Sequence, residues 1–247
     1  LSRYSLDHYL LEIASRIGVR VAQECRVTDV HGNAADGCQI RTSLGDFHTK
    51  VVCGSYGKYA PQFIRLHENE ASNADNQNYI GVKYHIKTDF PANRIELHNF
   101  NDGYCGISKV DRDWYCLCYL TTARNLLAHG KDVKQMEEEV LFQNPFLKQY
   151  FTQSEFIHPQ PLVISNVQFR RKQTDSNGIF LLGDAAGSIT PLCGNGMSMG
   201  MRASKLLAEQ LFLLFNQKQT HQQALQNYHL AWNAAFGTRI RAGYHLQ

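Results

Sequence analysis

The stretch Ile179-Phe-Leu-Leu-Gly-Asp-Ala-Ala-Gly187 decides the fold, together with Ser188-Ile-Thr-Pro191 and Gly194-Asn-Gly196, which follow it. An apolar run ends in Gly-Asp, a loop containing proline follows, and a Gly-x-Gly then opens a long amphipathic pattern. This order predicts a carboxylate at the carboxyl end of a buried strand and free backbone N–H groups at the start of a helix. Open α/β folds hold cofactors with those two features.

Asp184 is the residue of this stretch that most clearly indicates cofactor binding. A carboxylate beside small residues can accept hydrogen bonds from the hydroxyl groups of a ribityl or ribose chain. Ala185, Ala186 and Gly187 would then allow the cofactor to approach the backbone closely. The alternative interpretation is an aspartate that only caps the turn after the strand.

These residues resemble the second flavin-contacting motif of the p-hydroxybenzoate-hydroxylase-like superfamily of FAD-dependent oxidoreductases. That superfamily includes FAD-dependent monooxygenases and geranylgeranyl-reductase-like enzymes. The resemblance implies an α/β fold, in which a partial FAD-binding Rossmann-like domain carries an inserted antiparallel-sheet substrate domain. It also implies FAD as the cofactor and the following cofactor-binding residues: Arg3, Gly183, Asp184, Ala185, Ala186, Gly187, Pro191, Gly194, Asn195, Gly196 and Met197.

The resemblance assigns particular roles at the two ends of the chain. It places the backbone N–H groups from Gly194 to Met197 at the N1–C2=O edge of the flavin. The positive end of a helix there favours the anionic reduced flavin. Arg3 precedes Leu6-Asp7, as in a family segment whose arginine approaches FAD; the alternative is a solvated side chain.

The chain departs from the hydroxylase pattern in three ways. Tyr56 stands where the family has aspartate, so NAD(P)H as the electron donor is left open. Gly187 stands where aromatic hydroxylases commonly carry histidine, which favours the reductase-like branch. No G-x-G-x-x-G fingerprint for the FAD pyrophosphate precedes the first helical pattern. We therefore expect this chain to be a piece of a longer protein, and whether that protein contains the missing unit does not follow from the sequence.

The hydrophobic pattern divides the chain into three parts. From Tyr79, a period of two predicts an antiparallel meander with turns at Asn101-Asp-Gly103 and Asp111-Arg-Asp113. Before it we expect a helix capped by Ser5 and short strands; after it we expect helices opened by Asp132 and by Asn144-Pro145. The expected early strands are 19–21, 27–30, 38–42 and 49–53. The predicted domains are 1–67 and 161–247 for FAD binding and 68–160 for the substrate.

Composition indicates a globular protein. Its 247 residues are 43% hydrophobic and 19% charged, and the net charge is +3. A charge this small, without a basic stripe among aromatics, argues against a nucleic-acid partner. We expect no transmembrane segment, leave peripheral membrane contact open, and interpret the seven cysteines as reduced thiols of a cytoplasmic protein without a metal site.

The sequence thus predicts an FAD-dependent oxidoreductase that acts on a hydrophobic small molecule, with the isolated fragment inactive. The interpretation favoured at this point is reduction of a C=C bond, as in geranylgeranyl reductases. One alternative is an FAD-dependent monooxygenase of an aromatic or polyketide-like substrate, and a second is a non-catalytic, degenerate flavoprotein fragment. Candidate pocket residues are Lys83, His85, Tyr104 and Cys105, and Cys193 is a candidate redox thiol. The exact substrate and the oligomeric state do not follow from the sequence.

Overall fold

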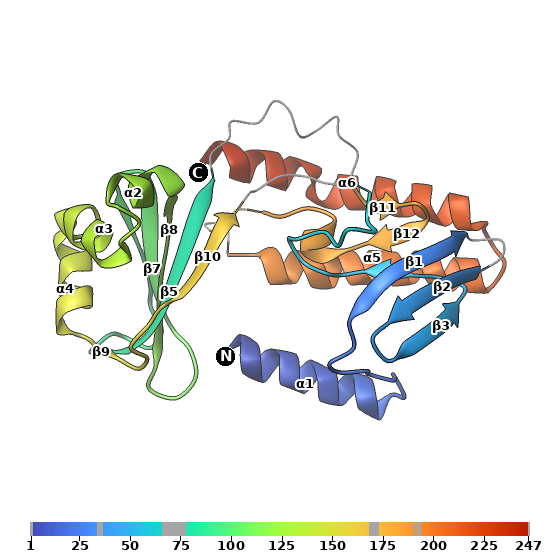
Figure 1. Cartoon of the computed structure of the whole chain (residues 1–247), viewed down its shortest axis with the longest axis horizontal. Coiled ribbons are helices and arrows are strands. Elements are labelled where there is room, and N and C mark those ends of the chain that lie inside the picture. The colour runs from blue at the N-terminus through green and yellow to red at the C-terminus, as the bar shows by residue number, and fades with distance from the viewer. Residues whose placement is uncertain are drawn as a thin grey trace. The chain divides into compact units, whose positions relative to one another are not determined.

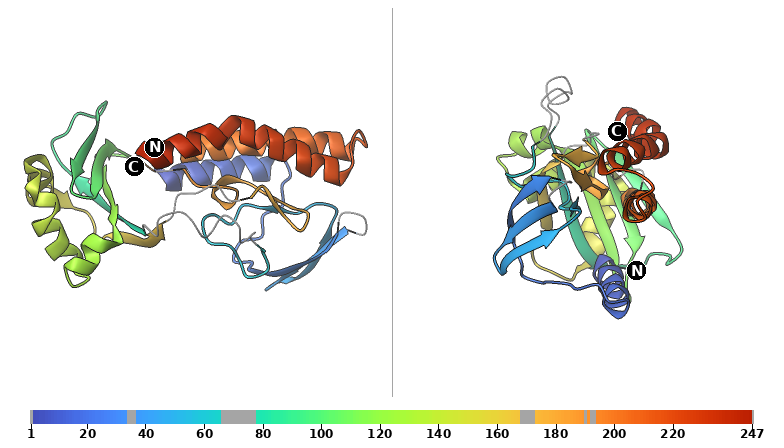
Figure 2. Two further views of the ribbon diagram at one scale, coloured as in Figure 1. Left: turned by 90° about the horizontal axis from the view of Figure 1, so that it is seen from above. Right: turned by 90° about the vertical axis from the view of Figure 1, so that its right-hand side faces the viewer.

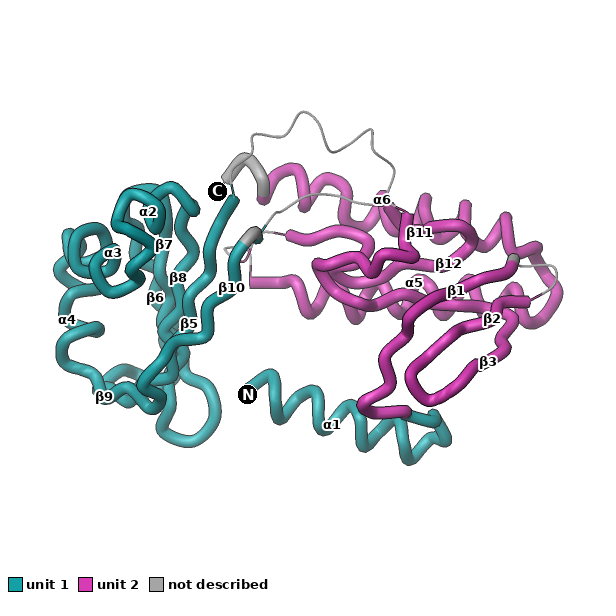
Figure 3. The backbone as a smooth tube through the Cα atoms, in the orientation of Figure 1, with its two compact units in different colours: residues 1–21, 75–168 teal, residues 22–74, 169–247 magenta. Residues whose placement is uncertain are grey.

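The computed structural model describes residues 2–33, 37–65, 78–167, 173–189, 191 and 194–246. Its contacts group into two compact units (Figure 3). Unit 1 contains residues 1–21 and 75–168, and unit 2 contains residues 22–74 and 169–247. Helix 3–16 and strand 162–167 therefore belong to the same compact unit as the inserted sheet. The division by function into 1–67, 68–160 and 161–247 stays a prediction.

Unit 1 is built on the predicted antiparallel meander. Its strands are β5 (Tyr79–Lys87), β6 (Ile95–Phe100), β7 (Gly103–Lys109) and β8 (Tyr115–Thr122). Phe100 pairs with Gly103, so Asn101 and Asp102 form a two-residue turn, with Asp102 at φ 58°. The edge strand β10 (Leu162–Val167) pairs with β5, giving the order β10-β5-β8-β7-β6, and β9 (Glu155–Phe156) also pairs with β5.

Helices cover one face of this sheet, as Figure 1 shows. They are α2 (Ala123–Ala128), α3 (Val133–Glu139), the 3₁₀ turn η2 (Leu141–Gln143) and α4 (Pro145–Gln153). The predicted caps are confirmed: Asp132 accepts from Lys134 N at 2.8 Å, and Asn144 accepts from Phe146 N at 3.0 Å. The core between sheet and helices includes Ile86, Ile107, Leu117, Met136, Leu141 and Leu147.

Helix α1 (Arg3–Arg16) begins one turn earlier than predicted. Ser2, and not Ser5, is the N-cap, because its hydroxyl accepts from Ser5 N at 3.1 Å. Asp111, in the turn after β7, accepts from Ser2 N at 2.9 Å and from the Ser5 hydroxyl at 2.7 Å. Hydrogen bonds from the Ser2 side chain, the Ser5 side chain and the Ser2 backbone N–H lower the pKa of Asp111 to about 2. The strand expected at 19–21 does not form.

Unit 2 contains two small sheets and two long helices. One sheet is the antiparallel set β1 (Val27–Asn33), β2 (Gly37–Thr42) and β3 (Gly45–Thr49). In the other, β12 (Ile179–Leu181) pairs antiparallel with β11 (Asp175–Ser176) and parallel with β4 (Cys53–Gly54). Helices α5 (Gly196–Phe215) and α6 (His221–Leu246) lie side by side in both Figure 1 and Figure 2.

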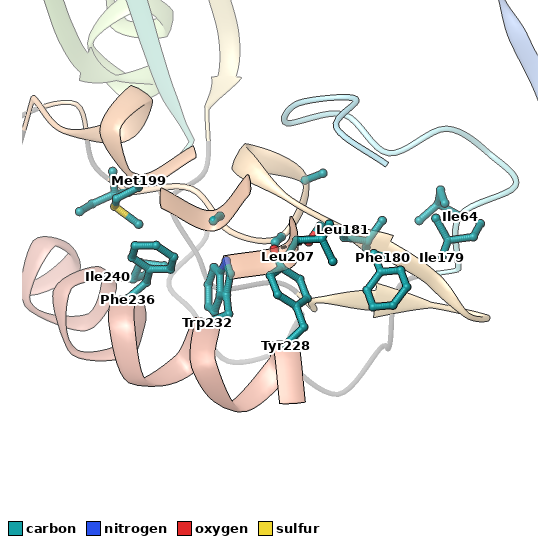
Figure 4. Packing of buried hydrophobic residues seen from close by; sticks show 14 of the residues in the cluster. Ile64, Ile179, Phe180, Leu181, Met199, Leu207, Tyr228, Trp232, Phe236 and Ile240 are labelled. Carbon is teal, nitrogen blue, oxygen red and sulfur yellow. Dashed lines mark hydrogen bonds between the residues drawn. The ribbon is translucent and has the colours of Figure 1, made fainter. Parts of the chain in front are cut away.

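The core of unit 2 lies against one apolar side of each of the two long helices. Tyr228, Trp232, Phe236 and Ile240 of α6 are buried, and α5 adds Met199, Ala203 and Leu207 (Figure 4). The Tyr228 hydroxyl donates to the Leu181 carbonyl at 3.0 Å, which ties α6 to the buried strand β12. None of the described helices is long and apolar enough to cross a membrane.

Candidate functional site

The buried strand β12 ends in a sharp turn, as the Gly-Asp pattern predicts. Phe180 and Leu181 are fully buried, and Leu182 N donates to the Gly54 carbonyl at 3.1 Å, which extends the parallel pairing with β4. Gly183 has φ +62°, a conformation that side chains disfavour, and begins the 3₁₀ turn η3 (Gly183–Ala185). The chain therefore turns directly after the strand and leaves Asp184 half-buried as the second residue of that turn.

Asp184 lines a small pocket between the turn and the two long helices. The pocket is formed by the turn after β12, the first turns of α5 and the buried side of α6. Its lining consists of Gly183, Asp184, Gly187, Ile189, Gly196, Met199, Gly200, Ala203, Trp232 and Phe236. Gly200 of α5 faces Gly183 of η3: a Cβ on Gly200 would lie in ordinary contact, 4.0 Å from the Gly183 Cα.

Gly187 is required by packing. A Cβ at this position would lie 2.9 Å and 3.2 Å from two carbons of the buried Trp232 ring. Ala185 and Ala186 beside it are fully buried. A histidine, which the hydroxylase motif commonly has here, would overlap the tryptophan ring. Trp232 thus gives a packing reason for Gly187, and the preference for the reductase-like branch that was drawn from this glycine stays a prediction.

The second half of the predicted motif forms the start of α5. Gly194 has φ +63°, and its N–H donates to the Pro191 carbonyl at 2.9 Å. Asn195 is the N-cap residue, yet its side chain makes no capping hydrogen bond. Gly196 and the exposed Met197 follow in the first turn, whose N–H groups have no carbonyl partner within a helix. The Cys193 prediction lies outside the described residues.

Two buried polar atoms of this loop have no hydrogen-bond partner among the described residues. They are the Asn195 Oδ1 and the Ser188 Oγ. Buried polar atoms are paired in the great majority of cases, so unpaired ones require an explanation such as a missing ligand. The helix N–H groups are donors and Asn195 Oδ1 is an acceptor. This donor and acceptor set fits the pyrimidine edge of a flavin, which carries both C=O and N–H groups.

The other predicted residues differ in what the structure shows of them. Arg3 lies on α1 in unit 1 and pairs with Asp7 at 3.1 Å on an exposed surface, so its contact with FAD stays a prediction. Tyr56 lies in unit 2, and burial raises the pKa of its phenol. The Tyr56 hydroxyl is buried and has no hydrogen-bond partner in the described part of the chain.

The candidate pocket residues of unit 1 do not share one face of the sheet. Lys83 and His85 alternate with buried residues of β5 and lie on the face opposite the helices. Burial, followed by the charge of Lys83 and by His158, lowers the pKa of His85. Cys105 points the other way, is fully buried in the core beneath the helices, and has a raised pKa because of burial. The pairing of Tyr104 with Cys105 in one pocket is therefore wrong, since neighbours on a strand point to opposite faces.

Sequence reasoning missed Glu137, the most buried carboxylate described in unit 1. It is 6% exposed and accepts hydrogen bonds from the hydroxyls of Tyr84 and Tyr119, each at 2.8 Å. The signal was present: Glu137 lies within the helical stripe that carries Met136, Val140 and Leu141. Among the described residues, no group of three or more His, Cys, Asp or Glu side chains could hold a metal ion.

Comparison with known proteins shows what the sequence and the fold resemble. The family model described as squalene epoxidase matches residues 116–235. The flavin-dependent halogenase CmlS has a TM-score of 0.77 at 16% identity, over 96% of this chain and 44% of that one. The myxobacterial chondrochloren halogenase CndH, an FAD-dependent enzyme, has a TM-score of 0.77 at 17% identity, over 99% of this chain and 59% of that one. The chain therefore has the fold of these flavin-dependent enzymes, and residues 116–235 resemble the squalene epoxidase family.

Two further similar proteins indicate what share of a longer chain this one matches. PqsL of Pseudomonas aeruginosa, described as an FAD-dependent monooxygenase, has a TM-score of 0.64 at 17% identity, over 97% of this chain and 68% of that one. Conditioned medium factor receptor 1 of Dictyostelium discoideum is 29% identical over 96% of this chain. The chain spans 48% of the length of that curated relative.

Proposed function

We propose that this chain is the part of an FAD-dependent monooxygenase that holds the flavin ring and binds an apolar, aromatic small molecule. The flavin would be held by Asp184, the small residues around it and the first turn of α5. The observation that carries the proposal is the pocket in which Asp184 lies together with Gly196. The following loop adds Asn195 Oδ1, which has no hydrogen-bond partner in the part of the chain that the structure describes. When bound, reduced flavin supplies the electrons that activate O₂.

The choice of monooxygenation over C=C reduction rests on two points. Gly187 was the main reason to favour reduction, and Trp232 now accounts for that glycine by packing. The matched family is that of squalene epoxidase, and one structural relative is described as an FAD-dependent monooxygenase. Reduction of an isoprenoid C=C bond has no comparable support.

The substrate surface that we propose is the face of the unit 1 sheet opposite the helices. Large apolar side chains lie exposed on it: Ile95, Leu97, Leu162 and Ile164 have exposed fractions of 74, 53, 64 and 52%. Lys83 and His85 add polar groups on the same face. Apolar surface with a few polar groups is typical of sites for small organic ligands.

The remaining parts of the proposal concern the electron donor and the location of the protein in the cell. NAD(P)H is the proposed electron donor. For each oxygen atom inserted into the substrate, the reaction would consume one O₂, two electrons and two protons, and it would release one water. Tyr56, at the position of the family aspartate, makes slow direct reduction by NAD(P)H an expected property of the protein. A cytoplasmic location is part of the same proposal.

An isotope experiment tests the reaction type. The full-length protein with FAD is reduced without air and mixed with candidate aromatic and isoprenoid substrates, first anaerobically and then with ¹⁸O₂. The proposal expects no product before oxygen is admitted and one ¹⁸O atom in the product afterwards. Conversion without oxygen would contradict it in favour of reduction. A halogenated product formed only with added chloride or bromide would contradict it in favour of halogenation.

A further inference from the structure

Glu137 places a carboxylate inside unit 1, away from the face proposed for the substrate. Three elements meet at it, because α3 carries Glu137, β5 carries Tyr84 and β8 carries Tyr119. Both tyrosine hydroxyls donate to the same oxygen, Oε1, at 2.8 Å. Among the described residues, no donor contacts the second oxygen, Oε2. One oxygen of the carboxylate is thus held by the protein, and the other has no donor in the described part of the chain.

A cavity opens directly beside this carboxylate. It measures about 850 Å³ and lies entirely within unit 1. Aromatic rings form much of its wall, namely Tyr84, Phe142, Phe151 and Phe156. Tyr84 contacts Phe151 and Phe156 edge to face, with ring centroids 5.7 Å and 5.0 Å apart, so these walls support one another.

The charged residues that line the cavity differ in their exposure to solvent. Asp132, Lys131, Lys134 and Glu138 also line it, and all four are exposed. The Asp132 carboxylate is engaged in capping α3, where it accepts from two backbone N–H groups. Among the carboxylates that line the cavity, Glu137 is the buried one. Burial raises its pKa to about 6, which leaves it mostly ionised at pH 7.5.

A buried negative charge among aromatic rings selects a particular class of ligand. An ammonium group can pair with the carboxylate and is also attracted to the faces of aromatic rings. An apolar body attached to it would fill the remaining space against the phenylalanines. A metal ion is a poor alternative, because the described residues here lack three ligating groups.

From this arrangement we propose that the cavity beside Glu137 is a second ligand site, which binds a small organic amine with an aromatic or aliphatic body. The ammonium group pairs with Glu137 Oε2, and the body packs against Phe142, Phe151 and Phe156. The site does not depend on flavin binding or on the proposed monooxygenase reaction.

Two matched probes test the proposal on the unmodified protein. Binding of 4-phenylbutylamine and of 4-phenylbutanol is measured by isothermal titration calorimetry at pH 7.5. These probes differ in charge and share the same body. We expect the amine to bind about ten- to a hundredfold more tightly, as a charge-assisted hydrogen bond implies. Equal affinities, or no binding of either probe, would overturn the proposal, and this comparison requires no variant to fold.

Two variants then locate the charge. Glu137→Gln keeps the shape and an oxygen acceptor for the two tyrosines, and should weaken amine binding at least tenfold while alcohol binding stays within about twofold. Glu138→Gln removes the same charge from an exposed residue of the same helix and cavity rim, and should change both affinities by less than about twofold. If Glu138→Gln reduces amine binding as much as Glu137→Gln, the amine responds only to the general surface charge and the site is refuted. Circular dichroism of both variants confirms that they are folded.

Discussion

Replacing Gly187 with alanine tests whether packing requires a glycine at this position. The added Cβ would lie 2.9 Å from one ring carbon of Trp232, whereas ordinary contact begins at 3.4 Å. Trp232 is 2% exposed and packs against Phe236 with ring centroids 5.4 Å apart, so the ring has little space into which to move. Inserting a methyl group into a core this tight typically costs about 1–3 kcal/mol, and we expect a loss of stability in that range.

Urea unfolding of the protein, followed by circular dichroism, measures this loss. Gly237→Ala is the matched control, since Gly237 lies within α6 and its Cβ would meet nothing within 4 Å. That substitution should stabilise the protein by about 0.5–1 kcal/mol, because alanine favours helix more than glycine does. In the double variant Gly187→Ala/Trp232→Phe, the smaller ring should relieve the clash and give a coupling energy of about 0.5–3 kcal/mol. A stabilising or neutral Gly187→Ala, or strictly additive effects in the double variant, would refute the packing explanation.

Two further predictions concern buried polar groups. The pKa of Glu137 rises from 4.5 to about 6 on folding, so the stability that this group contributes is present below pH 4.5 and is lost as the pH rises through 6. Unfolding measured at pH 4.5 and pH 7.5 should therefore show Glu137→Gln gaining about 2 kcal/mol relative to the unmodified protein between these values; no such relative gain would mean that burial does not penalise the charge. Tyr228→Phe removes the donor to the Leu181 carbonyl and should cost about 1–3 kcal/mol in the same assay, and an unchanged midpoint would show that this bond contributes nothing.

Local patterns in the sequence predicted much of the fold. The two-residue turn at Asn101 and Asp102 sets the register of the β6–β7 hairpin, so the meander could be read directly from its alternation. The caps Asp132 and Asn144 and the four-residue spacing from Tyr228 to Ile240 are equally local. Such features depend on neighbours within one turn or one hairpin.

Features that depend on distant parts of the chain were missed. Strand β10 joins the meander by pairing Leu162 with Lys83, and its sequence has no alternation that reveals this partner. Ser2 caps α1 partly because Asp111, far along the chain, binds its N–H. The reason for Gly187 lies in Trp232, on a different helix.

The candidate site divides in the same way. The strand, the turn at Gly183 and the start of α5 follow from the order of small and apolar residues, and Asp184 lies where that order placed it. The helical stripe could have indicated that Glu137 is buried, but its two tyrosine partners lie on β5 and β8 and do not follow from that local pattern.

The central claim is that the segment around Asp184 holds the flavin, and FAD affinity measures it most directly. Full-length protein carrying Asp184→Ala is compared with the unmodified protein and with Asp46→Ala, which removes an exposed carboxylate of β3 in the same unit. Flavin is removed, and FAD is titrated back while its fluorescence is followed. We predict that Asp184→Ala weakens FAD binding about ten- to a hundredfold, through loss of a charge-assisted hydrogen bond, and that Asp46→Ala leaves it unchanged. Equal FAD affinity of all three folded proteins would contradict the assignment and leave Asp184 as a residue of the turn alone.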